Sequence, residues 1–141
     1  MLQKIFRNIY EIKKTTNNIT LVIKDSTFSN LILSTYGNND KKSILQTIAN
    51  SSMSISDILD KANIPKSSGY KIINSLINDG FLVIGEKIKN PDGNLVSSYS
   101  STISSVNIKI KNSIIEIEIE FPKSSIAKSH ILSLSLGRKK L

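Results

Sequence analysis

The sequence predicts an α+β fold in which a helix-rich segment is followed by two β-hairpins. Residues 54–84 read as a helix, a tight turn, a second helix and a strand, because two apolar stripes at helical spacing flank a short break. Residues 90–94 (NPDGN) have the composition of a turn between two strand candidates. Residues 106–121 alternate apolar and charged side chains, which is typical of a half-buried hairpin.

The first helix of the 54–84 segment is expected to start at Ser56, a suitable N-cap, with Asp57 in its first turn to complement the helix dipole. Asn63 ends its apolar pattern, and Ile64 is expected to be a buried anchor in the turn. Pro65 fits a helix start, where its missing N–H costs nothing. The apolar stripe of this helix consists of Ile58, Leu59 and Ala62.

The second helix is predicted from about Lys66 to Asp79, with Gly80 as its C-cap. Helical geometry divides its side chains into two faces. Gly69 is unfavourable inside a helix, so we expect it to allow close packing against the preceding helix. The face expected to pack inward holds Gly69, Tyr70, Ile73, Leu76 and Ile77. The outward face holds Ser67, Ser68, Lys71, Asn74, Ser75 and Asn78.

The outward face has the chemistry of a DNA contact surface. Phosphates accept hydrogen bonds from Ser, Lys and backbone N–H groups, and Asn pairs with adenine edges. The alternative is an ordinary solvated helix face, which is also polar. The ordered combination of a capped helix, a short turn, a Pro-started helix, a Gly and a strand favours DNA binding.

The segment IPKSSGYKIINSLINDGFLV resembles the winged helix-turn-helix transcription regulators of archaea, in the ArsR/MarR/TrmB-like group, and the resemblance covers about residues 39–102. The resemblance implies a winged helix-turn-helix fold. It indicates the fold more specifically than the function, because such domains also serve as protein-interaction modules. The residues that carry it are Ile64, Lys66, Ser67, Ser68, Tyr70, Lys71, Leu76, Gly80, Phe81 and Leu82.

This domain, residues 39–102, is expected to start with a helix over about 40–50 that Asp40 opens or caps. Its core side would carry Ile44, Leu45 and Ile48. Residues 81–89 and 95–101 are predicted to form the hairpin called the wing. Lys87 and Lys89 near its tip suit phosphate or minor-groove contacts; the alternative is a solvated hairpin tip.

An N-terminal extension, residues 1–38, precedes this domain. Residues 2–12 are predicted to form a basic amphipathic helix, which would pack on the domain or on a second subunit; contact with a membrane surface is the alternative. A strand is expected over 19–24 and a helix over 26–36. Gly37-Asn38-Asn39 marks a break.

Residues 103–122 are predicted to form a second hairpin. A two-residue turn at Asn112-Ser113 would place Ile108 opposite Ile117, Lys109 opposite Glu116 and Ile110 opposite Ile115. The glutamates of this hairpin are interpreted as a solvated sheet face rather than a cation or catalytic site. Its isoleucine face needs cover, either from the N-terminal segment or from a second subunit. Residues 123–141 form a basic tail ending in LGRKKL, a phosphate-binding arm or a frayed terminus.

Composition sets further limits. The 141 residues suit one domain with short extensions, and there is no cysteine and a single histidine, His130, so we expect no metal site and no cofactor. No apolar run reaches the ~18 residues of a membrane span, and the N-terminus lacks a signal-peptide pattern, so a cytoplasmic protein is expected. No nucleophile elbow or Gly-rich phosphate loop is present, and we expect no enzyme activity.

The net charge of +8 favours an anionic partner, although an AT-rich genome would also enrich lysine. Residues 39–102 contain seven Lys and six acidic residues, a net charge of +1, so the excess lies in the two ends. The first hypothesis is a sequence-specific regulator that binds double-stranded DNA, works as a homodimer and has an unknown effector. The second is a winged-helix protein-interaction module. The DNA-binding residues of the first hypothesis are Lys66, Ser67, Ser68, Tyr70, Lys71, Asn74, Lys87 and Lys89.

Overall fold

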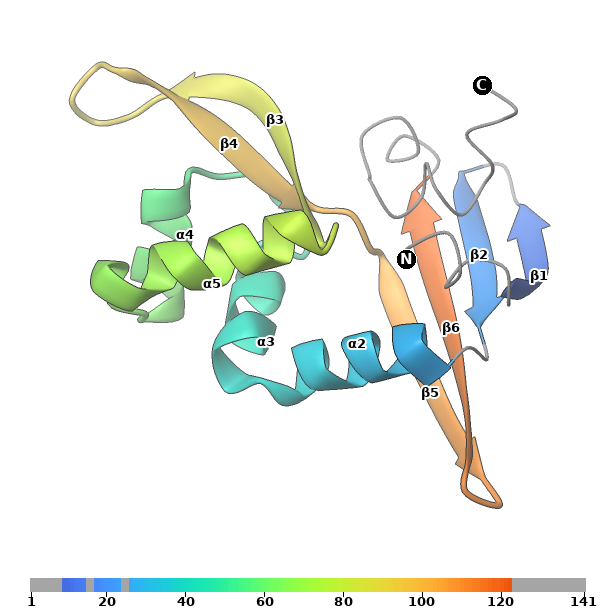
Figure 1. The fold of residues 1–141 in the computed structure, drawn as a ribbon. Coiled ribbons are helices and arrows are strands. Elements are labelled where there is room, and N and C mark those ends of the chain that lie inside the picture. The colour runs from blue at the N-terminus through green and yellow to red at the C-terminus, as the bar shows by residue number, and fades with distance from the viewer. Residues whose placement is uncertain (1–8, 15–16, 24–25, 123–141) are drawn as a thin grey trace. The chain divides into compact units, whose positions relative to one another are not determined.

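The protein has an α+β fold with two compact units. The computed structural model describes residues 9–14, 17–23 and 26–122, and within these it contains four helices and two antiparallel sheets (Figure 1). One unit, the sheet unit, combines residues 1–35 with residues 102–141, and the other, the helical unit, spans residues 36–101. Two segments that are far apart in sequence therefore build one unit together.

The sheet unit contains a four-stranded sheet in the order β1-β2-β6-β5, in which every neighbouring pair is antiparallel (Figure 1). Its strands are β1 (Ile9–Lys14), β2 (Asn18–Ile23), β5 (Ser105–Lys111) and β6 (Ile114–Pro122). The predicted N-terminal helix is wrong over residues 9–12, because this part pairs with β2 as a strand. A short apolar pattern does not distinguish a helix from a strand, and pairing decides between them. Residues 1–8 lie outside the described part.

The predicted register of the second hairpin is confirmed. Ile108 lies opposite Ile117, Lys109 opposite Glu116 and Ile110 opposite Ile115. Asn112 and Ser113 form the turn with positive φ values of 53° and 62°. Two left-handed residues in succession match the right-handed twist of the flanking strands, which is why this turn closes a tight hairpin.

The core of the sheet unit lies on one face of the β2–β6 pair. Ile19 is opposite Phe121, Leu21 opposite Ile119 and Ile23 opposite Ile117, and all six are at most 1% exposed. Strand β2 therefore lies beside β6 in the same sheet and continues its isoleucine face. It does not cover that face. Helix α2 (Ser26–Gly37), which confirms the helix predicted over 26–36, buries Phe28 and Ile32.

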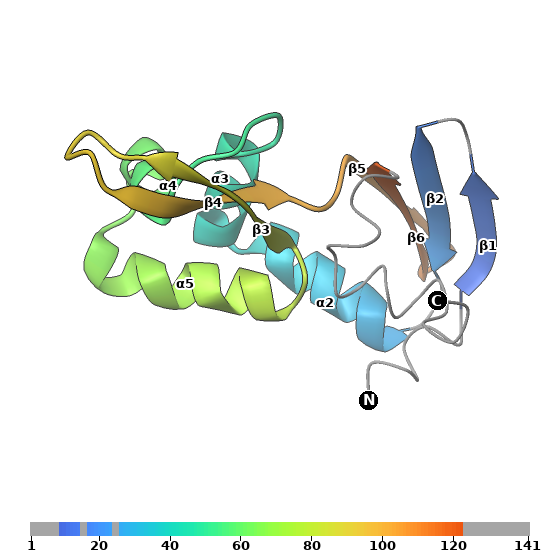
Figure 2. The ribbon, with the colours of Figure 1, turned by 90° about the horizontal axis from the view of Figure 1, so that it is seen from above.

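The helical unit contains three helices and a hairpin (Figure 2). Helix α3 contacts α4 and α5, α5 contacts β3, and α4 contacts β4, so the helices and the hairpin share one core. The elements are α3 (Asn39–Thr47), α4 (Ile55–Ala62), α5 (Lys66–Asn78), β3 (Leu82–Lys89) and β4 (Leu95–Ser101). The fully buried core side chains include Ile44, Ile48, Ile58, Leu59, Ile73, Leu76 and Phe81.

Two predicted helix caps are wrong by two residues each. Helix α4 is capped by Ser54, whose Oγ accepts a hydrogen bond from the backbone N–H of Asp57 at 3.2 Å, and not by Ser56. Helix α3 is capped by Asn38, whose side chain accepts a hydrogen bond from the N–H of Lys41 at 2.9 Å. Asp40 is not the cap, but it lies in the first turn of the helix. In both cases a second residue of a capping type lies nearby, so composition alone does not select the cap.

The turn between α4 and α5 matches its prediction. Asn63 adopts a left-handed conformation with a φ of 57° and ends α4. Ile64 is buried at 7% exposure and anchors the turn. Helix α5 starts at Lys66 directly after Pro65. Its C-cap is Asp79, one residue before the predicted Gly80, which follows with a φ of 88°.

Met53 adds a bridge to the hairpin that the sequence pattern did not indicate. Its N–H donates to the carbonyl of Tyr99 at 3.1 Å, and the N–H of Tyr99 donates to the carbonyl of Met53 at 2.8 Å. The segment between α3 and α4 is therefore attached to β4.

Candidate nucleic-acid interface

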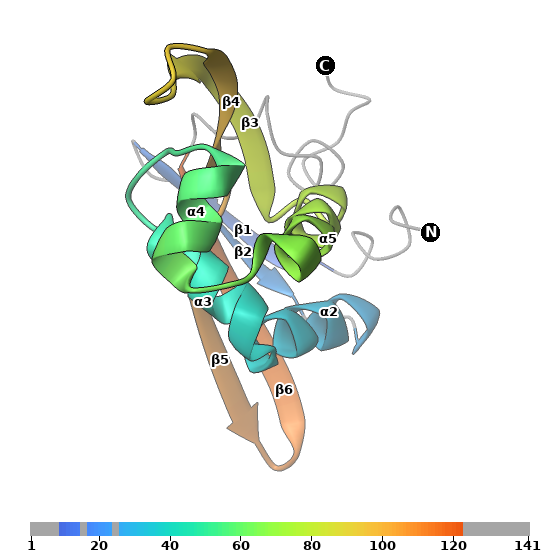
Figure 3. The ribbon, with the colours of Figure 1, turned by 90° about the vertical axis from the view of Figure 1, so that its left-hand side faces the viewer.

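One face of helix α5 carries polar side chains that are exposed to solvent. Figure 3 shows the helix beside α4. Gly69, Ile73 and Leu76 are buried on the opposite side, as expected from their spacing. Ser75 is half-buried rather than fully outward. Among the residues predicted to contact DNA, those exposed on α5 are Lys66, Ser67, Ser68, Tyr70, Lys71 and Asn74.

Tyr70 differs from its prediction, because it was assigned to the inward face and is 46% exposed. In a helix it lies about 100° from Gly69, at the edge of the buried stripe. Its ring therefore turns towards the hairpin, where it lines a groove with Tyr99. The phenol is accessible from solvent.

The groove between α4, α5 and the hairpin holds about 410 Å³, and we call it the acidic groove. Three carboxylates line it, from Asp57, Asp60 and Asp92, and none of its lining residues is Lys or Arg. All three aspartates are exposed. These acids were not among the residues predicted for the site, although the spacing of three between Asp57 and Asp60 places both on one side of α4. The groove repels phosphate and attracts cations.

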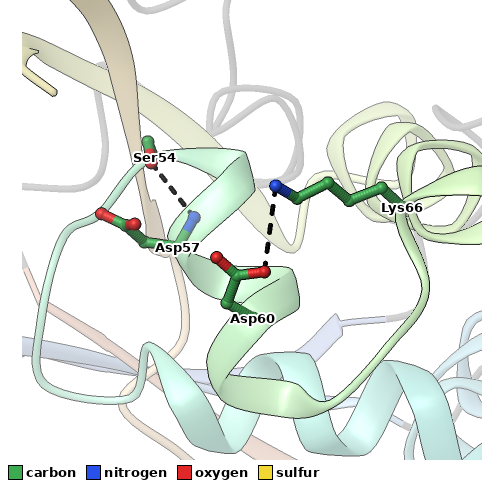
Figure 4. A network of polar contacts seen from close by, with 4 residues as sticks. All are labelled: Ser54, Asp57, Asp60 and Lys66. Carbon is green, nitrogen blue, oxygen red and sulfur yellow. Dashed lines mark hydrogen bonds and ion pairs between the residues drawn. The ribbon is translucent and has the colours of Figure 1, made fainter. Parts of the chain in front are cut away.

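Lys66 is paired with one of these carboxylates. Its Nζ lies 3.9 Å from Oδ1 of Asp60, and Figure 4 shows the pair beside the cap formed by Ser54 and Asp57. The two side chains are 51% and 66% exposed, so the pair contributes roughly 0–1 kcal/mol to stability. The pair also matters for a ligand, because Asp60 offsets part of the positive charge that Lys66 would offer to a phosphate.

The tip of the β3–β4 hairpin is ordered by Asn90. Its Oδ1 accepts hydrogen bonds from the N–H groups of Asp92 at 3.0 Å and Asn94 at 2.9 Å. Gly93 provides the left-handed position of the turn, with a φ of 83°. These bonds hold the end of the strand that carries Lys89.

Lys87 and Lys89 are both exposed on β3. They are two residues apart, so they project from the same face of the strand. A bulge between Ile84 and Lys87 shifts the register just before them. Bulges bend a strand and redirect its side chains, so this bulge sets the direction in which the two lysines point.

Other site types have no support in the described residues. They contain no group of three His, Cys, Asp or Glu side chains placed to hold a metal ion. Within the same part of the chain no helix has the length and apolar character needed to cross a membrane. His130 and the basic tail lie outside the described residues. Comparisons with protein-family models, with curated proteins and with solved structures gave no match.

Proposed function

We propose that the protein is a winged helix-turn-helix regulator of transcription that binds double-stranded DNA in a sequence-specific manner as a homodimer. Helix α5 would enter the major groove, and the β3–β4 hairpin would act as the wing on the backbone or in the minor groove. The observation that carries the proposal is the exposed face of α5, which combines Lys71 and Asn74 with Ser67 and Ser68 and contains no acidic residue.

Each proposed contact has a distinct role. Lys71, Lys87 and Lys89 supply charge to phosphates and carry no sequence information. Asn74 is exposed in the middle of α5 and would pair with a base edge, preferentially adenine. Ser67 and Ser68 lie in the first turn of α5, where N–H groups and hydroxyls suit a phosphate. The N–H and the hydroxyl of Ser68 donate to the carbonyl of Pro65 at 3.2 Å and 3.4 Å, so Ser68 would have to exchange a bond with Pro65 for one with a phosphate. Tyr70 lines the acidic groove, so its exposed hydroxyl would reach a phosphate only where it points out of the groove.

The experiment is selection of bound sequences from a random duplex library, followed by titration of the selected and an unrelated duplex. Lys71→Ala should weaken both complexes by a similar factor, whereas Asn74→Ala should reduce the preference for the selected duplex by about tenfold, since one good base contact contributes about 1–3 kcal/mol. Lys42→Ala, an exposed lysine on α3, is the charge-matched control and should change neither. Failure to select any sequence, with equal binding to all duplexes, would contradict sequence-specific recognition.

The acidic groove supports a second candidate function, a winged-helix module that binds a basic segment of another protein. Asp57, Asp60 and Asp92 supply negative charge, and Tyr70 and Tyr99 supply aromatic faces for Lys or Arg side chains. The seven lysines and six acids of residues 39–102 fit this function as well. Titration with a Lys/Arg-rich peptide distinguishes this candidate function from DNA binding. The peptide should bind, and Asp57→Asn should weaken its binding. The protein should have no affinity for duplex DNA at low salt.

A further inference from the structure

Strand β5 leaves one edge of the four-stranded sheet without a neighbour among the described residues. It is the last strand in the order β1-β2-β6-β5. Ile108 and Ile110 of β5 are 40% and 65% exposed, whereas Ile117 and Ile119 on the same face of β6 are fully buried. The apolar face of the sheet unit thus continues past its own core onto an open edge.

The register of the hairpin determines which backbone groups face that edge. Lys111 and Ile114 flank a two-residue turn, and residues in that position exchange both of their hydrogen bonds. In an antiparallel pair, every second residue of a strand directs its N–H and C=O groups at the partner strand. Lys109 and Asn107 therefore also direct their backbone groups at β6. Val106, Ile108 and Ile110 therefore present their N–H and C=O groups to the free edge, on the residues that carry the apolar side chains.

We propose that a second copy of this chain pairs with this edge, with the two β5 strands antiparallel and a twofold axis at Ile108. Ile108 would then lie opposite Ile108 of the partner subunit, and Val106 opposite Ile110 of the partner subunit. All three apolar side chains of β5 meet apolar side chains on the same face. Asn107 lies opposite Lys109 of the partner subunit on the other face. The two sheets become one continuous sheet.

Charge selects this register over its neighbours. An axis at Lys109 would place that lysine directly opposite Lys109 of the partner subunit, and an axis at Ile110 would place it opposite Lys111 of the partner subunit; like charges in these positions destabilise a strand pair. An axis at Asn107 would place Ile110 opposite Ser104 of the partner subunit and leave it poorly covered. Registers shifted by an odd number of residues would pair apolar with charged positions.

Lysines on an edge strand usually oppose association with another strand. Their positions on β5 therefore decide which pairing registers are acceptable. Lys109 already lies opposite Glu116 of its own chain, which offsets its charge. Lys111 would lie opposite Ser105 of the partner subunit in the proposed register. The lysines thus disfavour the registers with an axis at Lys109 or Ile110, and they do not disfavour the register with its axis at Ile108. This pairing concerns the sheet unit and does not rest on DNA binding.

Cysteine cross-linking tests the register directly, because the chain contains no cysteine. Ile108→Cys should form an intermolecular disulfide under mild oxidation, since directly opposed Cα atoms are about 5.5 Å apart. Ile110→Cys alone should not, because two copies of residue 110 would be separated by roughly 13 Å along the strand. A mixture of Ile110→Cys and Val106→Cys should form the heterodimer. Equal cross-linking of Ile108→Cys and Ile110→Cys would overturn the register.

The molar mass in solution tests the pairing itself, measured by analytical ultracentrifugation over a range of concentrations. The full chain should approach the mass of a dimer, and Ile108→Lys should remain monomeric because it places two charges at the axis. Ile114→Lys is the matched control: this residue is 65% exposed on the opposite face of β6, so the dimer should persist. A monomeric wild-type chain at every concentration, or a dimer that survives Ile108→Lys, would overturn the proposal.

Discussion

Gly69 of α5 lies against Leu59 of α4 with no room for a side chain between them. A Cβ added at Gly69 would come within 2.5 Å and 2.7 Å of the two Cδ atoms of Leu59, which is itself fully buried. Both residues lie at the crossing of the two helices whose relative position sets the outward face of α5. The proposed DNA contacts therefore depend on a packing contact on the other side of the helix.

Gly69→Ala should destabilise the protein by up to about 2 kcal/mol. Alanine gains up to ~1 kcal/mol in helix propensity over glycine, but overpacking against a buried leucine costs about 1–3 kcal/mol or more. The measurement is urea denaturation followed by circular dichroism. Gly37→Ala is the control, because a Cβ there meets nothing within 4 Å, and it should be neutral or stabilising. A more stable Gly69→Ala variant would show that the two helices separate at no cost.

Thr35→Val should stabilise the protein by about 1 kcal/mol. Thr35 is fully buried in α2, and its hydroxyl has no hydrogen-bond partner among the described residues. Valine has the same shape and removes the desolvated hydroxyl. The comparison uses the midpoint of urea denaturation, with the exposed Ser34→Ala on the same helix as control. A destabilised Thr35→Val variant would mean that the hydroxyl is satisfied.

Tyr36 should make the protein less stable at high pH. Burial raises the pKa of its hydroxyl above the usual value of 10.0. The folded state therefore keeps a proton that the unfolded state loses, so this contribution is complete below pH ~10 and is lost as the pH rises through the folded pKa. The ring packs edge to face on Phe81 with centroids 6.4 Å apart, and Tyr36→Phe keeps that contact. Denaturation at several pH values should show a smaller alkaline loss of stability for Tyr36→Phe; identical profiles would contradict the pKa shift.

Asp60→Asn should increase the affinity for duplex DNA by roughly two- to fivefold at low salt, because it removes a negative charge beside Lys66 at a distance where charges in water interact by about 1 kcal/mol. Fluorescence anisotropy with a labelled duplex measures the change. Asp40→Asn, an exposed acid on α3, removes the same charge elsewhere and should have a smaller effect. Reduced affinity in Asp60→Asn would indicate that the Lys66–Asp60 pair positions α5 instead.

The sequence predicted local structure where one pattern dominated. The alternation over residues 106–121 and the turn at Asn112-Ser113 predicted the register of the second hairpin to the residue, and its strands extend one residue further at each end. The caps at Ser54 and Asn38 were missed because two capping residues competed at each helix start. The four-stranded sheet was missed because its pairing of β2 with β6 joins segments almost 100 residues apart, and no local pattern encodes that contact.

The candidate site was predicted in part. The outward face of α5 followed from helical geometry, and Lys66, Lys71 and Asn74 are exposed there. The acidic groove was not predicted, because it arises only when α4 and the hairpin tip bring Asp57, Asp60 and Asp92 towards Tyr70. A search along one helix does not reveal acids that neighbouring elements supply.

The most direct test of DNA binding is the dependence of duplex affinity on salt concentration. If Lys71, Lys87 and Lys89 contact phosphates, a plot of log affinity against log salt should have a steep negative slope. Each Lys→Ala variant should make that slope shallower by about one unit, because each phosphate contact contributes about 0.9 to it. Lys42→Ala should leave it unchanged. Absence of duplex binding at low salt, or an affinity that is independent of salt, would contradict the proposed function.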